Sequence, residues 1–298
     1  MGGLSLLRGS LLIGARRGTS GRPARLPAMD EDIAHLGLLE DETIALDTTA
    51  LEIAGLDHPH ADLDDYADVL SDLTERLADV ADGADAVARQ AGALADVIAG
   101  EFGFVGDRES YDDPDNADLI RVIDRRRGLP VSLAILYVSA ARRMGWSADA
   151  LNTPGHVLVR VNSPADPLLI DPFNHGAVVG AVQLASLLMH MTGSHAVPTS
   201  EHLAAMSNRS VLVRLLMNQA TRAESTGDAE RALTLYRRMT LIAPSNPHPW
   251  WERARLELLR GEVAAARASL SAMLEVTRDP EMRAHIFAAL DGTSGANG

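Results

Sequence analysis

The sequence contains no cysteine and no lysine. The absence of cysteine excludes disulfides, cysteine-based zinc sites, iron–sulfur ligation and any thiol nucleophile within the chain. The absence of lysine means that all 27 basic residues are arginine, which excludes a lysine Schiff base and a P-loop lysine. Aromatic residues make up only 4% of the chain, so we expect a core built mostly from Leu, Ala, Val and Ile.

Long hydrophobic runs are missing as well, and basic charge is scarce. No stretch approaches the ~18 consecutive apolar residues that a membrane-spanning helix needs. The formal net charge is −14, and residues 30–69 hold 13 acidic residues and no arginine. Such a field repels phosphate backbones. We therefore expect a cytoplasmic protein with no nucleic-acid partner, no membrane partner and no cofactor.

Residues 1–29 reverse this balance, with five arginines and no acidic residue. Their apolar stretch is cut by Arg8, and no A-x-A-like cleavage site follows it, so we expect a disordered extension and not a signal peptide. The total of 298 residues suits about two domains of ~150 residues. We expect the first domain at residues 30–206, helical repeats at 207–290 and a disordered tail at 291–298.

Two helical patterns define the first domain. The apolar residues Leu63, Leu70 and Leu77, with others between them, recur at spacings of three and four, which predicts an amphipathic helix. The segment LPVSLAILYVSAARRMG is apolar almost all round and predicts a buried helix. Pro130 suits its first turn, where a missing N–H costs nothing.

Three short apolar runs follow this buried helix. They read SADALN, HVLVRVN and PLLIDPF, and turn-forming residues separate them, so we predict an antiparallel meander and an α+β fold. Alternation along a strand places His156, Leu158 and Arg160 on one face. Asp171 ends the third run.

The tail repeats itself with a period of 34 residues. Ala220 and Ala254, Gly227 and Gly261, and Ala232 and Ala266 are pairs at this separation. Small residues at this period are typical of tetratricopeptide repeats, in which each unit is a helical hairpin. A hairpin cannot bury its own apolar face, so we expect two hairpins that pack on each other and on the first domain.

The segments YDDPDNADLIRVIDRRRGLPVSLAILYVSAARRMG, PGHVLVRV and IDPFNHG, followed by the repeats, resemble the bacterial SirB-one family of transglutaminase-like proteins. The resemblance covers about residues 40–285. It implies an α+β, papain-like core with a small antiparallel sheet and N-terminal helices, followed by tetratricopeptide repeats.

The resemblance also implies a site. Active transglutaminase-like enzymes carry a G-x-C pattern at the start of the helix, a His that takes the thiol proton and an Asp that orients the His. Here Gly128, Leu129 and Pro130 stand at the helix start. His156 and Asp171 match the other two positions, so the triad lacks its nucleophile.

Several alternatives remain open at this site. Ser132 could replace the nucleophile, but a hydroxyl would need His156 within about 3 Å; otherwise Ser132 satisfies an N–H in the first helical turn. Pro130, Arg160 and Asn174 are expected to line the cleft, and Arg160 either binds a carboxylate or neutralises a buried Asp. His156, Asp171 and His175 offer metal-ligand chemistry, but no regular element aims His175, so we expect no metal.

Three functions follow. The first is a protein- or peptide-binding or regulatory protein with a non-catalytic transglutaminase-like domain, acting through the cleft, the repeats or both. The second is a hydrolase or acyl-transfer enzyme using Ser132, His156 and Asp171. The third is a scaffold in which only the repeats matter.

Overall fold

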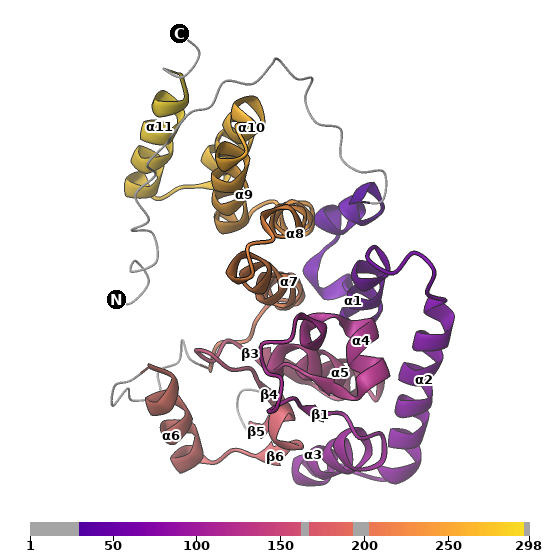
Figure 1. Ribbon diagram of the computed structural model, residues 1–298. Helices are drawn as coiled ribbons and strands as arrows, with labels where there is room; N and C mark the ends of the chain where they lie inside the picture. Colours follow the sequence, from indigo (N-terminus) through magenta and orange to yellow (C-terminus); the bar gives the residue numbers. More distant parts are fainter. Residues whose placement is uncertain (1–29, 162–166, 193–202, 295–298) are drawn as a thin grey trace. The chain divides into compact units, whose positions relative to one another are not determined.

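The computed structural model describes residues 30–161, 167–192 and 203–294 (Figure 1). The chain divides into two compact units, the first ending at Ala243 and the second beginning at Pro244. The extension predicted at residues 1–29 lies outside the described residues, as do residues 295–298 of the predicted tail. Within the described ranges, no helix is long and apolar enough to cross a membrane.

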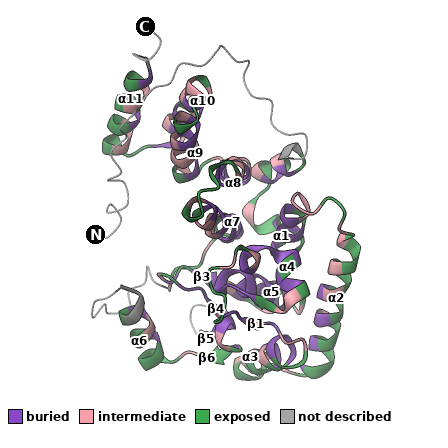
Figure 2. Cartoon of the chain, in the orientation of Figure 1, coloured by how far each residue is buried: buried purple, intermediate pink, exposed green. Residues whose placement is uncertain are grey.

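Helix α5 (Pro130–Arg143) is the centre of the first unit. Every residue from Pro130 to Ala141 is buried, and Figure 2 shows this part of the unit in purple. Burying one Leu or Ile side chain contributes about 1.5–3 kcal/mol, so a helix that is apolar on all sides must be enclosed by other elements. The predicted buried helix is confirmed.

Other helices enclose α5 from the N-terminal part of the chain. They include α1 (Leu46–Gly55), α2 (Leu63–Val80), α3 (Val87–Leu94) with its π-helical continuation η3 (Ala95–Glu101), and α4 (Leu119–Arg125). Short 3-10 helices complete this part: η1 (Asp30–Leu38), η2 (Asp41–Thr43) and η4 (Pro114–Ala117). Helix α2 contacts α5 and buries only one stripe, Leu70, Leu73 and Leu77, which agrees with its predicted amphipathic pattern (Figure 2).

A four-stranded antiparallel sheet has the order β3-β4-β5-β6. The strands are β3 (Ala148–Leu151), β4 (Leu158–Val161), β5 (Leu168–Asp171) and β6 (Ala177–Val178), with the 3-10 turn η5 (Pro172–Asn174) after β5. The predicted three-strand meander is confirmed, and β6 adds a short edge. A separate parallel pair joins β1 (Val105–Gly106) to β2 (Arg127–Gly128).

Helices pack on this sheet. Helix α5 contacts β3 and β4. Leu184 and Leu188 of α6 (Ala181–Thr192) join Leu151 and Leu158 in a second apolar cluster. The last part of the sheet, near Asp171, also contacts α5 through η5.

The first helical hairpin belongs to the first unit. It consists of α7 (Asn208–Ser225) and α8 (Ala229–Ile242). Asp57, after α1, accepts hydrogen bonds of 2.6 Å from both Arg231 Nη1 and Arg231 Nη2, and one of 2.8 Å from Arg238 Nη1. The division at 243/244 therefore differs from the boundary expected at residue 206, because polar contacts tie this hairpin to the first helices.

The second unit contains a further hairpin and one more helix. They are α9 (Pro247–Leu259), α10 (Val263–Val276) and α11 (Pro280–Ser294). Ala254, Ala266 and Leu270 form its core with Met273 and Ile286. Two of these residues, Ala254 and Ala266, come from the 34-residue register. Helix α11 continues to Ser294, so it extends into the segment that we expected to be a disordered tail.

Removing the Asp57 carboxylate should weaken the attachment of this first hairpin. Burial raises the pKa of Asp57, but the hydrogen bonds and charges of Arg238 and Arg231 hold the pKa below its ordinary value. Asp57→Asn should lower the free energy of unfolding by about 2–3 kcal/mol at pH 7, since charged hydrogen bonds to two arginines are lost. Urea unfolding measures this loss, with Asp72→Asn on the exposed face of α2 as the control. Equal stability of the two variants would contradict the structural role of Asp57.

Candidate functional site

His156 and Asp171 meet inside the first unit. His156 Nε2 lies 2.9 Å from Asp171 Oδ1, and the residues are 8% and 3% exposed. Asp171 ends β5, whereas His156 stands two residues before β4, in the turn that follows Thr153. The predicted hydrogen bond is confirmed, although His156 precedes the strand on which we expected it.

The carboxylate of Asp171 accepts several further hydrogen bonds. Oδ1 accepts from the backbone N–H groups of Phe173 at 3.0 Å and Asn174 at 3.3 Å, and Oδ2 accepts from Asn174 Nδ2 at 2.5 Å. Burial raises the pKa of Asp171, but the hydrogen bond and charge of His156 and the bonds from Asn174 hold it below its ordinary value. Asp171 is therefore an anion at neutral pH.

An anionic Asp171 fixes the tautomer of His156. A carboxylate only accepts hydrogen bonds, so Nε2 of the imidazole must carry the proton. Nδ1 carries the lone pair whenever the ring is uncharged, and it makes no hydrogen bond to the described residues. The ring also meets Phe173 edge to face, with centroids 6.0 Å apart. The pair thus holds an oriented base with one free nitrogen.

The start of α5 offers no nucleophile to this base. Leu129 is the N-cap and Pro130 the first helical residue. The hydroxyl of Ser132 is 0% exposed and donates to the backbone oxygen of Asn116 at 2.7 Å. Ser132 therefore satisfies a carbonyl, not the helical N–H that the sequence suggested, and in the described part of the chain no hydrogen bond joins it to His156.

Arg160 and His175 lie away from the pair's hydrogen bonds. Arg160 Nη2 donates to Asp149 Oδ2 at 2.5 Å, from the position directly opposite on β3. Of the two predicted roles, the structure gives Arg160 the neutralisation of an Asp. His175 is exposed in a left-handed turn, and no group of metal-ligating side chains occurs among the described residues.

Asn174 does lie at the site, and Arg108 orients it. Arg108 Nη2 donates to Asn174 Oδ1, which turns the amide nitrogen of Asn174 toward Asp171. The guanidinium also lies over the Phe173 ring, 5.7 Å from the centroid. Phe173 can sit there because Gly106 has no side chain: a Cβ at Gly106 would stand 2.5 Å from the ring.

Tyr137 is a site residue that sequence reasoning missed. Its hydroxyl is buried on α5 and has no hydrogen-bond partner in the described part of the structure. Burial, and then the charge of Asp171, raise the pKa of Tyr137, so the phenol keeps its proton. Gly176 has φ +70°, and a Cβ there would lie 2.8 Å from the hydroxyl. The available signal in the sequence was that Tyr137, the one aromatic residue of this apolar helix, carries a polar hydroxyl.

An open groove lies beside Asp171 and Asn174. Its volume is about 600 Å³, within the size range of ligand sites. Residues of β6 and α6 make most of its wall, and five of its nine lining residues are apolar. The lining residues are Asp171, Asn174, Ala177, Val178, Val179, Val182, Gln183, Ser186 and Leu187.

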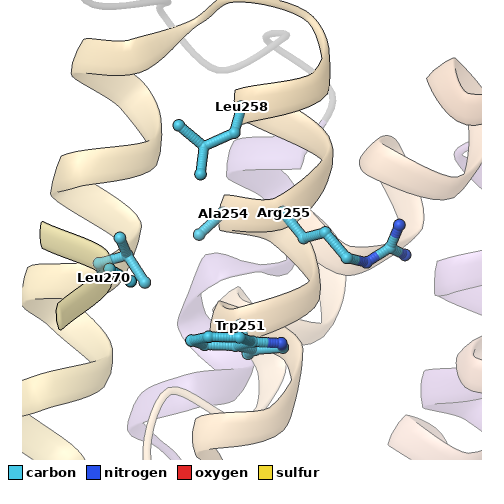
Figure 3. A pocket seen from close by; sticks show the side chains of 6 residues that line it. Trp251, Ala254, Arg255, Leu258 and Leu270 are labelled. Atoms are coloured by element: carbon cyan, nitrogen blue, oxygen red, sulfur yellow. The ribbon is translucent and has the colours of Figure 1, made fainter. Parts of the chain in front are cut away.

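A cavity in the second unit is much smaller. It lies between α9, α10 and α11, where Trp251, Ala254 and Leu258 face Leu270 while the head group of Arg255 points away (Figure 3). Its free volume is about 10 Å³, room for about one water molecule. It is a packing defect of the helices and no ligand site.

The low pKa of Asp171 makes the stability of the first unit depend on pH. A carboxyl group whose pKa is lower in the folded than in the unfolded chain stabilises the fold. This stabilisation is complete above the unfolded pKa, about 3.9, and is lost as pH falls through the folded pKa. Asp171→Asn should therefore lower the free energy of unfolding by about 1–3 kcal/mol at pH 7, because an amide donor would face the donors of His156 and Asn174.

The difference from the unmodified chain should shrink below about pH 4. Urea unfolding at pH 7, 5 and 3 measures it. Asp112→Asn is the control, since the Asp112 side chain is 95% exposed. A difference that stayed constant with pH would show that Asp171 is not the low-pKa group described above.

Comparison with known proteins agrees with this architecture. Residues 62–217 match the family described as "Transglutaminase-like superfamily". A UPF0162 protein of Xylella fastidiosa (strain 9a5c) is 31% identical over 245 residues, which are 81% of this chain and 87% of the relative. A UPF0162 protein of Vibrio cholerae is 34% identical over 117 residues, 39% of this chain and 43% of the relative.

A shorter similarity reaches a eukaryotic protein. F-box only protein 21 of Mus musculus is 32% identical over 79 residues, 26% of this chain and 13% of that protein. No solved structure matches the chain. The family match includes α5, the His156 turn, Asp171 and the first part of α7. On the family match, which spans just over half of the sequence, and on its UPF0162 homologues, the chain belongs to the transglutaminase-like superfamily.

Proposed function

We propose that this protein is a transglutaminase-like protein without acyl-enzyme chemistry, which binds a peptide or protein segment beside its His156–Asp171 pair. The proposal places it in the cytoplasm. It also takes the two helical hairpins to be tetratricopeptide-like repeats, so that a partner can contact the groove, the repeats or both. No cofactor is required for this role.

One observation carries the proposal: the structure contains an oriented histidine base but no nucleophile at the start of α5. Asp171 holds His156 with a free Nδ1, while Pro130 occupies the start of α5. A histidine and an aspartate can bind and polarise a group such as an amide, and the start of α5 offers no thiol or hydroxyl for the acyl-enzyme route. Recognition of a peptide group remains available to such a site.

The alternative is a hydrolase or acyl-transfer enzyme using Ser132. It would require the hydroxyl to leave the Asn116 carbonyl at 2.7 Å and turn toward His156. Ser132 is 0% exposed, so a substrate carbonyl would also have to enter the packed start of α5. These two requirements favour the binding role.

The groove beside Asp171 suits an extended peptide. Strand β6 ends the sheet, and both of its residues are exposed. A free strand edge offers backbone donors and acceptors to an added strand. Apolar side chains flank this edge, with Val178 at 56% and Val182 at 79% exposure. The groove thus combines backbone pairing, apolar contact and a polar end at Asn174.

Selection of short random peptides on the purified protein tests this role. Val182→Asp should weaken the binding of selected peptides at least tenfold, about 1.4 kcal/mol, because it puts a charge into the apolar wall. Val80→Asp, at an exposed position on α2, is the matched control. Leu259→Asp, at 72% exposure on α9, tests separately whether the helical hairpins contribute to peptide binding. Fluorescence anisotropy measures the affinities; peptides bound equally by the Val182→Asp variant would refute the groove as their site.

A second test restores the missing nucleophile. The unmodified chain should show no transglutaminase or cysteine-protease activity, since it has no thiol. Pro130→Cys introduces a single thiol at the positive end of α5, and both the helix end and His156 should lower the thiol pKa. Because Pro130 is buried, ionisation of the thiol is followed by ultraviolet absorbance, which needs no access of a reagent; the thiolate should persist to lower pH than that of free cysteine.

Ser225→Cys provides the control for this experiment. Ser225 is exposed at the last residue of α7, where the negative helix end disfavours a thiolate. Its thiolate should persist to no lower pH than that of free cysteine. If the thiol of Pro130→Cys behaved in the same way, the start of α5 would not be the neighbour of His156 that the family resemblance implies.

A further inference from the structure

Arg214 of α7 holds the turn that carries His156. Its guanidinium makes three hydrogen bonds to this turn. Nη1 donates to Asn152 Oδ1 at 2.8 Å, and Nη2 donates to the backbone oxygens of Thr153 at 3.0 Å and His156 at 2.7 Å. Helix α7 is thus hydrogen-bonded to the backbone of His156, the candidate base.

This arginine is a half-buried cation, and it forms no ion pair with a carboxylate among the described residues. Burial lowers the pKa of Arg214. A desolvated charge is costly unless hydrogen bonds compensate it. The compensation comes from one amide and two main-chain oxygens, which the planar, many-donor guanidinium can reach together. A smaller neutral side chain could not close all three bonds.

The turn itself needs such support. It is closed by the His156 N–H, which donates to Thr153 O at 3.1 Å, and Gly155 has φ +64° within it. His156 precedes β4, so no strand pairing fixes its backbone. Among the described residues, two hydrogen-bond partners outside the turn hold His156: Arg214 on its backbone oxygen and Asp171 on its ring.

We propose that Arg214 is a positioning residue for His156, so that α7 forms part of the candidate site. By fixing the backbone of the turn, Arg214 keeps Nε2 of the ring on Asp171 and leaves Nδ1 free. The inference rests on the proposed function only in naming His156 as the group that meets a ligand. The positioning itself can be measured without any ligand.

The same helix supplies a matched control. Arg222 lies two turns along α7 and also donates to two backbone oxygens, of Tyr111 at 3.0 Å and Asp112 at 3.1 Å. These belong to a different loop. Arg222→Met therefore removes comparable contacts between α7 and the unit while leaving the His156 turn intact.

The experiment records the imidazole ¹⁵N signals of His156 in the full chain, assigned with His156→Gln. The unmodified protein should show the well-separated pair of signals of an Nε2–H tautomer. In Arg214→Met this separation should shrink to about half or less, because a loosened turn lets the ring leave Asp171 and exchange tautomers. Arg214→Lys keeps part of the contact and should fall between the two, and Arg222→Met should match the unmodified chain.

Two results would overturn the proposal. One is a folded Arg214→Met protein with an unchanged tautomer signature; the other is an equal change in Arg222→Met, which would show general loosening of α7. If Arg214→Met does not fold, the same measurement on Arg214→Lys tests the proposal. Tautomer signals of Arg214→Lys that match those of the unmodified chain would then overturn it. Peptide selection on the same variants is independent, so a failure of the peptide site is distinguishable from a failure of positioning.

Discussion

The carboxylate of Asp171 is the contact on which the site depends. Oδ1 accepts hydrogen bonds from the His156 ring and from two backbone N–H groups of η5, and Oδ2 accepts one from the side-chain amide of Asn174. The same group therefore caps the turn after β5, orients the amide that Arg108 contacts, and sets the tautomer of the histidine. Because all of these donors satisfy one buried charge, the loss of any of them would leave part of that charge uncompensated.

Elements far apart in the sequence meet around this carboxylate. Helix α5 contributes Tyr137, η5 contributes Phe173 and Asn174, and α7 reaches the turn of His156 through Arg214. The histidine and the groups that orient it are thus brought together from several elements of the first unit. The start of α5, where the family resemblance implies a nucleophile, holds a proline. Such a distribution fits a site that retains recognition without covalent catalysis.

Sequence patterns predicted the parts that depend on side-chain periodicity. The buried helix and the meander follow from apolar spacing, and the His156–Asp171 pair follows from their order and the family resemblance. The roles of Ser132 and Arg214 were hidden, because both side chains bond to backbone oxygens, which carry no residue-specific signal. Arg160 was placed beside His156 by strand alternation, but alternation begins only at Leu158. The repeat register could not show that α7 and α8 form one compact unit with the preceding helices, because it says nothing of the arginines that bind Asp57.

The Asp57 contacts have a consequence for the order in which the chain acquires its structure. Asp57 is separated by 174 residues from Arg231 and by 181 from Arg238. During synthesis, the first helices must wait for α8 to leave the ribosome before these bonds can form. Contacts of such long sequence separation slow folding and expose apolar surface in the meantime. We therefore expect the His156 turn, which needs α7, to reach its final geometry late, after the helices around α5 have already collapsed.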